Sequence, residues 1–390
     1  MKLLYVVDGL YPYVKGGSEV YMHELGLEMA RRGFKVTFLT FNWHGRRRFR
    51  LSGGVEVLGV GRPIEFYSRL GTRRVDEAFF FSLCLTKALL SEVRRLIKDV
   101  DLIHTTLQPY LHLHQPLLKH LPRRPPLIAT VWEYWGGYWF SYFRGFFKPF
   151  LASLVERYTL PIPDYLITTS KLTMKRILEA YPKPLNVKLI PPGINLRLID
   201  EAPIAKECFD VICVSRLVKQ KNLELLIEAI KRVSKRIPKV SCCIIGDGPE
   251  KARLLGLIDR YGLRGNVVLK GSQPRRVVYS LEKASKIMVH PSLREGFGFV
   301  VLEANACGLP VVVVKSPFNA SMELVEEGVN GFKVSNNPYE LARVIEELLV
   351  DEGLRLKLSR GARRVAELYD WGRRADDFKR FYEEVVEASS

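Results

Sequence analysis

The fold of this chain is decided by one stretch, His290-Pro-Ser-Leu-Arg-Glu-Gly-Phe-Gly-Phe-Val-Val-Leu-Glu-Ala-Asn-Ala-Cys-Gly-Leu-Pro310. An apolar strand over residues 286–290 is predicted to lead into a loop with two glycines, Gly296 and Gly298. A helix is predicted from about Gly298 to Gly308. The first turn of a helix carries N–H groups without intrahelical partners, and the positive end of the helix dipole lies there too. The stretch therefore predicts an anion pocket at the start of this helix.

Two carboxylates flank that predicted pocket. Glu295 stands just before the helix and Glu303 more than a turn inside it, with seven residues between them. A carboxylate repels an anion but accepts hydrogen bonds from neutral hydroxyls, such as those of a sugar or a ribose. We predict that the pair binds hydroxyls beside a bound anion. The alternative is an exposed helix with two solvated glutamates.

The second half alternates strands with helices of 10–15 residues. Strands are predicted over residues 210–215, 240–246, 266–271, 286–290 and 310–315. This alternation is typical of a doubly wound parallel sheet, whose ligands bind beyond the carboxyl ends of the strands. Ser215, Gly246, Gly271 and His290 end four of the strands, so we expect them to converge on one crevice. The run Gly246-Asp-Gly248 lacks the third glycine of a dinucleotide fingerprint and is weak evidence for NAD.

Two cations follow the first of these strands. Arg216 and Lys221 lie on the loop between Ser215 and a helix predicted over residues 222–236. Together with helix-terminal amides, two fixed cations can neutralise a diphosphate leaving group without a metal. Solvated side chains in a basic protein are the alternative interpretation.

The first half opens with a βαβ unit. A buried strand over residues 2–7 leads into Gly16-Gly17-Ser18-Glu19, where Ser18 is predicted to cap the following helix, and a second strand is predicted over residues 35–40. Paired glycines let a backbone approach a ligand closely, although they also occur in simple turns. The proline-marked run Pro191–Asn195 is predicted to separate the two domains.

These motifs resemble the retaining glycosyltransferases of family 4, or glycosyl transferases group 1, which have the GT-B fold and use nucleotide sugars. The resemblance rests on Glu-Gly-Phe-Gly-x-x-x-x-Glu-Ala at 295–304, on its flanking His-Pro-Ser and Gly-Leu-Pro, and on the loop at Gly16–Glu19. It implies an α/β chain of two Rossmann-like doubly wound domains facing a cleft. The acceptor-side domain would be residues 1–195 with a C-terminal crossover helix over 372–390. The nucleotide-sugar-binding domain would be residues 196–371.

The resemblance also implies roles for particular residues. Arg216, Lys221 and the amides at Gly296–Phe299 would stabilise charge on the leaving oxygen, Glu303 would hold ribose hydroxyls, and Glu295 would position the sugar. The implied catalytic residues are Glu295, Arg216 and Lys221. The implied donor-binding residues are Gly16, Gly17, Arg216, Lys221, Gln273, Glu295, Gly296, Phe297, Gly298, Phe299, Val300 and Glu303. The activity would be that of a hexosyltransferase (EC 2.4) with no metal or other cofactor.

An Asp-x-Asp pattern, which metal-dependent glycosyltransferases use, occurs at Asp99 and Asp101. It directly precedes the strand that begins at Leu102, and the first residues of a parallel strand lie away from the catalytic edge. We interpret the pattern as chance.

The chain departs from the family after the strand over residues 127–131. Family members commonly place there a histidine thought to contact the donor sugar, whereas this chain has Trp132 and Glu133. An indole cannot accept a hydrogen bond or a proton. Glu133 and Trp132 become candidates for the acceptor side, and His104 or His23 could also reach the site.

Charge and aromatic residues narrow the partners. The 390-residue chain has a formal net charge of +18, and 28 basic against 15 acidic residues give residues 1–195 a net charge of +13. An anionic partner is expected: a membrane face, a phosphorylated acceptor or nucleic acid, of which nucleic acid lacks a recognisable reading motif. The aromatic run Trp132–Phe150, with Arg144 and Lys148, suits either a membrane interface or an aromatic core or acceptor pocket. A glycan, lipid-linked or phosphorylated acceptor is expected.

The remaining composition favours a cytoplasmic protein, working at the inner face of the membrane. Six cysteines without a Cys-x-x-Cys pair indicate reduced thiols, and neither a signal peptide nor a membrane-spanning segment is expected. Two alternatives stay open. One is a non-catalytic membrane- or polyanion-binding protein on a degenerate GT-B scaffold; the other is a GT-B epimerase or phosphorylase, although no lysine setting for a pyridoxal cofactor is evident.

Overall fold

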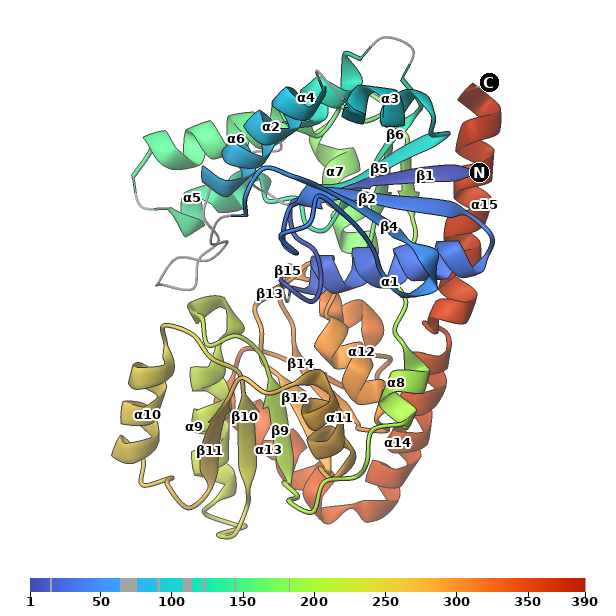
Figure 1. Ribbon diagram of the computed structural model, residues 1–390. Coiled ribbons are helices and arrows are strands. Elements are labelled where there is room, and N and C mark those ends of the chain that lie inside the picture. The colour runs from blue at the N-terminus through green and yellow to red at the C-terminus, as the bar shows by residue number, and fades with distance from the viewer. Residues whose placement is uncertain are drawn as a thin grey trace. The chain divides into compact units, whose positions relative to one another are not determined.

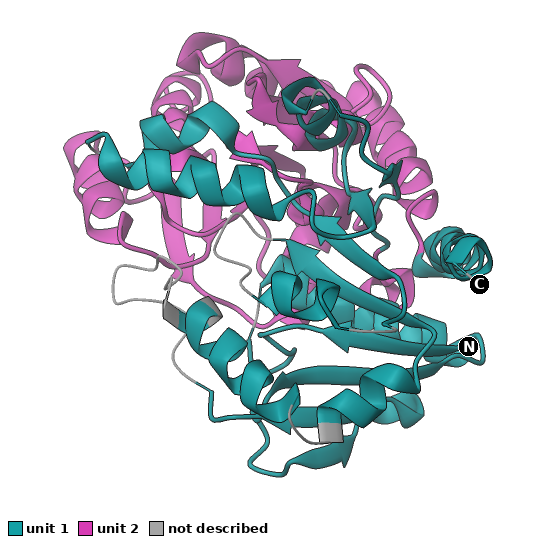
Figure 2. Ribbon diagram, turned by 90° about the horizontal axis from the view of Figure 1, so that it is seen from above, with its two compact units in different colours: residues 1–193, 371–390 teal, residues 194–370 magenta. Residues whose placement is uncertain are grey.

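The computed structural model describes residues 1–14, 16–63, 76–89, 92–107, 114–121, 124–143, 145–181 and 183–389. The chain forms two compact units, one of Met1–Gly193 with Trp371–Ser390 and one of Ile194–Asp370 (Figure 2). Each unit is an α/β structure built on its own sheet (Figure 1). The two units are described separately below.

Unit 1 is built on an eight-stranded sheet with the order β3-β4-β2-β1-β5-β6-β7-β8. Neighbouring strands pair in parallel except for β3 and β4, which are antiparallel. The strands are β1 (Lys2–Val6), β2 (Lys35–Phe41), β3 (Arg48–Arg50), β4 (Glu56–Val60), β5 (Leu102–Leu107), β6 (Leu127–Val131), β7 (Tyr165–Thr168) and β8 (Val187–Leu189). The predicted first βαβ unit is therefore present.

The helices of unit 1 come from both ends of the chain. They are α1 (Gly17–Arg31), α2 (Asp76–Leu89), α3 (Glu92–Lys98), α4 (His114–Lys119), α5 (Trp139–Tyr142), α6 (Phe147–Thr159), α7 (Lys171–Ala180) and α15 (Trp371–Ser389). The prediction that Ser18 caps α1 is wrong. Gly16 occupies the N-cap with extended backbone (φ −104°, ψ 165°), and Ser18 lies within the first turn, because the helix begins one residue earlier.

The two faces of this sheet carry different cores, because side chains alternate along a strand. Leu4 and Val6 of β1 belong to the core that also contains Phe81 and Leu85 of α2. Tyr5 points the other way, and its hydroxyl lies 3.3 Å from that of Tyr382 on α15. The C-terminal helix is thus an integral part of unit 1.

His104 helps to hold α15 on the sheet and cannot serve the sugar site. Its Nδ1 lies 2.6 Å from the Tyr382 hydroxyl and its Nε2 lies 2.8 Å from Oγ1 of Thr130. The side chain is fully buried, and burial lowers the pKa of His104 to about 3. The prediction that His104 reaches a ligand is wrong, because its position in the middle of β5 directs it into the core.

Unit 2 is built on a six-stranded parallel sheet with the order β11-β10-β9-β12-β14-β16. Its strands are β9 (Val211–Val214), β10 (Cys242–Ile245), β11 (Val267–Gly271), β12 (Ile287–His290), β14 (Val311–Val314) and β16 (Gly331–Val334). The short strands β13 (Arg294–Glu295) and β15 (Phe318–Asn319) pair separately. The helices are α8 (Leu196–Asp200), α9 (Leu223–Val233), α10 (Lys251–Arg260), α11 (Arg275–Lys283), α12 (Phe299–Ala306), α13 (Pro338–Val350) and α14 (Glu352–Glu367).

The strand order of unit 2 reverses between β9 and β12. From β9 the chain moves outward through β10 to β11, and it then returns to lay β12 on the other side of β9 before it continues to β14 and β16. Connections leave β9 and β12 in opposite directions, so a crevice opens beyond their carboxyl ends. The sequence after β9 and the sequence after β12 meet there.

None of the helices described here is long and apolar enough to cross a membrane.

Candidate functional site

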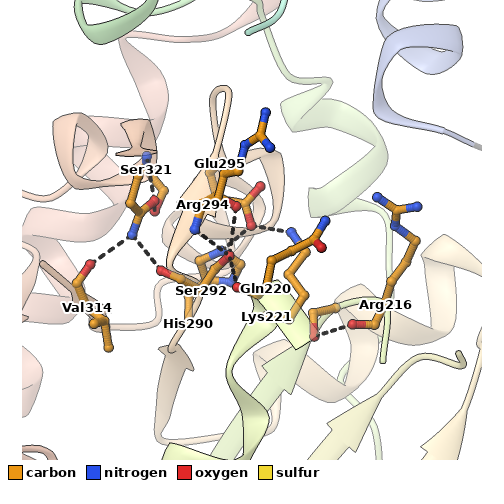
Figure 3. A network of polar contacts seen from close by, with 11 residues as sticks. Arg216, Gln220, Lys221, His290, Ser292, Arg294, Glu295, Val314 and Ser321 are labelled. Carbon is orange, nitrogen blue, oxygen red and sulfur yellow. Dashed lines mark hydrogen bonds and ion pairs between the residues drawn. The ribbon is translucent and has the colours of Figure 1, made fainter. Parts of the chain in front are cut away.

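The candidate site of unit 2 lies at this reversal point. The loop after β9 carries Arg216 and the short helix η3 (Lys219–Lys221), and the loop after β12 carries Glu295 (Figure 3). The backbone N–H of Leu293 donates to the carbonyl of Gln220 at 3.0 Å, so the two loops are joined directly. Residues more than 70 positions apart in the sequence are held together here.

Glu295 is fixed by two donors that bind the same oxygen. Lys221 Nζ donates to Glu295 Oε1 in an ion pair, and His290 Nε2 lies 2.7 Å from that oxygen. The side chains of Lys221 and Glu295 are only 13% and 14% exposed. Burial alone would raise the pKa of Glu295, but Lys221 and His290 outweigh it and hold this pKa well below its usual range.

The protonation of the pair follows from these contacts. Because Glu295 is ionised, it can only accept hydrogen bonds, so His290 carries its proton on Nε2. Both contacts use Oε1, while Oε2 of Glu295 makes no hydrogen bond to another described residue. Glu295 is therefore an oriented carboxylate with one oxygen available to a ligand.

A buried polar network supports the Glu295 loop. Asn319 Nδ2 donates to the carbonyls of Ser292 at 3.0 Å and Val314 at 2.9 Å, and its Oδ1 accepts from the Ser321 hydroxyl at 2.6 Å (Figure 3). Asn319, Ser321 and Ser292 are all fully buried. His290, Asn319 and Ser321 were not predicted as site residues, because nothing in their local sequence shows that they converge on Glu295.

The start of α12 has the geometry of an anion-binding helix end. Gly298 is its N-cap with φ +103°, and a Cβ there would lie 2.5 Å from Cβ of Ser321, so only glycine fits. The first intrahelical hydrogen bonds run from Val301 and Leu302 to the Gly298 carbonyl. The amides of Phe299 and Val300 come before those bonds and lie at the positive end of the helix dipole.

The other predicted residues of the glycine loop have mixed positions. Gly296 is buried within the loop. Phe297 is 5% exposed and packs in the core, with its ring 5.1 Å from that of Phe299. Its side chain anchors the loop from below, so a donor would meet the backbone here and not the Phe297 ring.

The structure brings together only part of the predicted charged set. Arg216 is exposed on the same edge, and its guanidinium makes no ion pair with another described residue. Glu303 Oε1 accepts from the Tyr279 hydroxyl at 2.7 Å and from Arg275 Nη2 at 3.0 Å, both on α11. Lys221 and Glu295 therefore touch, whereas Arg216 and Glu303 contact neither of them.

Gln273 follows β11 and donates from Nε2 to the Lys270 carbonyl at 2.8 Å. This local hydrogen bond holds the side chain over its own loop.

The predicted residues of unit 1 lie at the carboxyl ends of its strands. At Gly16 a Cβ would lie 2.0 Å from Oε2 of Glu19, so the neighbour that requires a glycine here is the chain's own glutamate. The ring of Trp132 meets that of Tyr21 edge-on at 4.8 Å. Glu133 Oε2 accepts from Trp135 Nε1 at 2.9 Å.

The Asp-x-Asp pattern lies at the opposite edge of the sheet. Asp99 Oδ1 accepts from Lys2 Nζ at 2.6 Å, and Asp101 Oδ2 accepts from the Lys2 amide at 2.7 Å, at the start of β1 and β5. Over the part of the chain that the structure describes, no group of three or more His, Cys, Asp or Glu residues could hold a metal ion.

The fold and this arrangement define a class of protein, a glycosyltransferase of GT-B type. The family model described as "Glycosyl transferases group 1" matches residues 197–365, and the model described as "Glycosyltransferase Family 4" matches residues 15–198. The chain belongs to the family 4, group 1 glycosyltransferases.

Curated relatives agree with this family. The chain is 32% identical over 162 residues to the phosphatidylinositol N-acetylglucosaminyltransferase gpi3 subunit of Schizosaccharomyces pombe, covering 41% of this chain and 36% of that protein. It is 25% identical over 317 residues to a phosphatidylinositol N-acetylglucosaminyltransferase protein of Arabidopsis thaliana, covering 80% and 67%. Such matches span between about a third and two thirds of the relatives' own length.

Solved structures share the fold. Sucrose-phosphate synthase from Thermosynechococcus elongatus matches with a TM-score of 0.81 and 20% identity over 100% of both chains. Anabaena HepE in complex with UDP-glucose matches with a TM-score of 0.71 and 20% identity, again over 100% of both chains.

Proposed function

We propose that the protein is a retaining glycosyltransferase that transfers a hexose from a nucleotide-diphosphate sugar, without a metal. The observation that carries the proposal is the Lys221–Glu295–His290 cluster at the reversal point of the unit 2 sheet, beside the start of α12. It combines a cation, an oriented carboxylate and helix-terminal amides, which are the groups that a diphosphate and a sugar require. The likeness to the fold of Anabaena HepE, solved with UDP-glucose, supports a nucleotide sugar as donor.

The leaving group is stabilised by charges and dipoles that the chain already holds in place. Lys221 uses one of its three ammonium protons on Glu295 and keeps the others for a phosphate oxygen. The Phe299 and Val300 amides and the exposed Arg216 face the same developing charge. Fixed donors of this kind lower the barrier because they need no reorganisation during the reaction.

The sugar and the ribose are held by the two glutamates. Oε2 of Glu295 accepts from a sugar hydroxyl, and Glu303, whose Oε1 is held by Tyr279 and Arg275, offers its second oxygen to the ribose. The bond between the anomeric carbon and the diphosphate oxygen breaks as the acceptor oxygen bonds to the same face of that carbon. The acceptor's proton passes to the departing phosphate oxygen, so no histidine is needed at the position of Trp132.

The acceptor is proposed to be a glycan, lipid-linked or phosphorylated molecule bound on unit 1 near Gly16, Gly17, Trp132 and Glu133. The names of the relatives support a lipid-linked acceptor, since several are phosphatidylinositol N-acetylglucosaminyltransferases. The net charge of +13 over residues 1–195 suits an anionic acceptor. The reaction is proposed to occur at the cytoplasmic face of a membrane.

A non-catalytic binding protein on this scaffold is the second candidate. It is favoured by Trp132, which stands where the family commonly has histidine, and by the basic first half. A protein that only binds has no need for a carboxylate oriented by both Lys221 and His290, so we favour the enzyme.

A panel of UDP, GDP and ADP sugars, each with and without EDTA, tests the proposal by thermal shift. A true donor above its Kd raises the melting temperature, and EDTA leaves that shift unchanged. Glu295→Gln should abolish turnover of the donor that binds, whereas Glu327→Gln, an exposed glutamate of the same unit, should not. A flat panel would favour the binding protein, and a product of inverted anomeric configuration would exclude the retaining mechanism.

A further inference from the structure

Helix α6 of unit 1 carries an apolar stripe that points into solvent. Phe147, Leu151, Leu154 and Tyr158 recur at the spacing of one helix face and are 76%, 48%, 37% and 69% exposed. The apolar face of a surface helix ordinarily turns toward the core. In α6 this arrangement is reversed.

The inner face of α6 explains why the stripe cannot turn inward. Glu156 is buried, and its carboxylate accepts from the backbone amides of Trp135 and Gly136, both at 2.7 Å, and from Trp139 Nε1 at 3.0 Å. These three hydrogen bonds tie the helix to the preceding aromatic segment in one rotational setting. Rotating the stripe inward would leave a buried carboxylate without its donors, which is costly.

The aromatic segment before α6 divides in the same way. Trp135 and Trp139 are buried, with ring centroids 4.3 Å apart. Phe140, Phe146 and Phe150 are exposed, and their rings form a chain, 6.0 Å between the first two and 5.6 Å between the last two. Both interpretations of the run Trp132–Phe150 are therefore partly right: the tryptophans fill a core, and the phenylalanines lie on the surface beside α5 and α6 (Figure 1).

The charge around the stripe has one sign. Lys148 and Arg157 are exposed on α6. Between residues 140 and 158 the sequence contains a single acidic residue, Glu156, which is buried and bound. The surface of α6 therefore offers apolar rings with cations beside them and no exposed carboxylate.

We propose that this α6 surface, made of Phe140, Phe146, Phe147, Phe150, Leu151, Leu154 and Tyr158 with Lys148 and Arg157, docks on the headgroup region of an anionic lipid bilayer. A helix that lies in that region buries Phe and Leu among the acyl chains and keeps Lys and Arg at the phosphates. The charge complementarity favours an anionic lipid surface over a second copy of this chain, which would bring cations against cations. The proposal goes beyond the glycosyl transfer, because lipid binding needs neither the donor nor the chemistry.

Flotation of the full chain with lipid vesicles tests this surface. One set of vesicles contains phosphatidylglycerol mixed with phosphatidylcholine, and the other contains phosphatidylcholine alone. The stripe variant combines Phe147→Ser and Leu151→Ser. The matched control combines Ile204→Ser and Val350→Ser, which remove side chains that are 71% and 77% exposed on unit 2.

We expect the wild-type chain and the control to float with the anionic vesicles. The stripe variant should partition at least about tenfold less, because two large apolar side chains no longer enter the bilayer. Lys148→Glu and Arg157→Glu should each lower partitioning about fivefold, and added salt should weaken it as well. Melting temperatures of the vesicle-free variants, which change only exposed positions, should match that of the wild type.

Other results overturn the proposal. Equal flotation of the stripe variant and the control would show that α6 is not the contact, and no flotation of the wild-type chain would exclude a lipid surface. A wild-type dimer in light scattering that the stripe variant dissociates, without vesicle binding, would assign the face to a second copy of the chain. None of these results bears on the donor panel, so the two proposals fail separately.

Discussion

Lys221→Met replaces the one cation that pairs with Glu295 by an unbranched apolar side chain of similar length. The substitution keeps much of the packing but removes an ammonium group whose side chain is 13% exposed. Glu295 keeps His290 as a donor at 2.7 Å. The variant therefore isolates the value of the charge.

The magnitude follows from the burial of the pair. Removing one partner of a buried, hydrogen-bonded ion pair costs about 3–5 kcal/mol, because the remaining charge loses its compensation. Since Glu295 is still hydrogen-bonded to His290, we expect the lower end, about 3 kcal/mol of unfolding free energy at pH 7. Loss of one fixed donor to the leaving group should also lower turnover of the donor sugar about 10²–10³-fold.

Urea denaturation of the full chain measures the stability term, with Lys219→Met as the control. Lys219 stands two residues away on the same short helix η3 and is exposed. It carries the same charge, so the control reproduces the change in net charge without breaking the Glu295 pair. Equal urea midpoints for the two variants at pH 7 would refute the reasoning.

The pH dependence of the difference provides a second check. In the wild type, Glu295 has a pKa held below its usual range, so its stabilisation is present above the pKa of the unfolded chain and is lost only as the pH falls through the lower folded value. In Lys221→Met, burial is opposed by His290 alone and this pKa rises. The gap between Lys221→Met and Lys219→Met should therefore be full at pH 7 and shrink below about pH 4–5. A gap that stays constant on acidification would contradict the ion pair as its cause.

Three further substitutions test other parts of the structure by urea denaturation. Gly298→Ala places a Cβ 2.5 Å from a buried serine at φ +103° and should cost about 1–3 kcal/mol and weaken nucleotide binding, whereas Gly265→Ala, with nothing within 4 Å, should cost far less. Glu282→Gln should flatten the pH profile: burial raises the pKa of Glu282 well above its ordinary value, so the wild type loses stability as the pH rises from about 5 toward 9, and an unchanged slope would refute the cause. Tyr382→Phe removes a hydroxyl 2.6 Å from buried Nδ1 of His104 and should cost about 1–3 kcal/mol, with faster amide exchange in α15; unchanged exchange would show that this contact does not hold the helix.

The elements of unit 2 were predictable because their signals are local. A run such as Val311–Val314 is apolar at every position, and the structure buries it completely as a central strand. Gly298 and Gly308 were predicted to bound a helix, and α12 runs between them from Phe299 to Ala306. Hydrophobic period and glycine position are properties of neighbouring residues, so they can be read without the tertiary structure.

The terminal cap of α1 was wrong for the same kind of reason. Ser18 is the better capping residue by preference, yet Gly16 holds the N-cap. The helix begins one residue earlier, and Glu19 folds back over Gly16. Helix ends are set by contacts of this kind, which preferences describe only on average.

The orientation of the aromatic run could not be predicted. Helical spacing shows that Phe147, Leu151 and Leu154 share a face, but it does not say whether that face turns inward. Glu156 decides it, because its carboxylate binds the Trp135 amide 21 residues back. A contact over that distance is visible only when the chain is folded.

The sequence by itself determined the class of fold, the strand and helix alternation, and the spacing of Glu295 and Glu303. Only the tertiary structure decided that Glu295 pairs with Lys221 and His290, while Glu303 is held by α11. The physical reason is strand order. The chain returns from β11 to lay β12 beside β9, and this non-local pairing brings loops 74 residues apart into hydrogen-bonding contact.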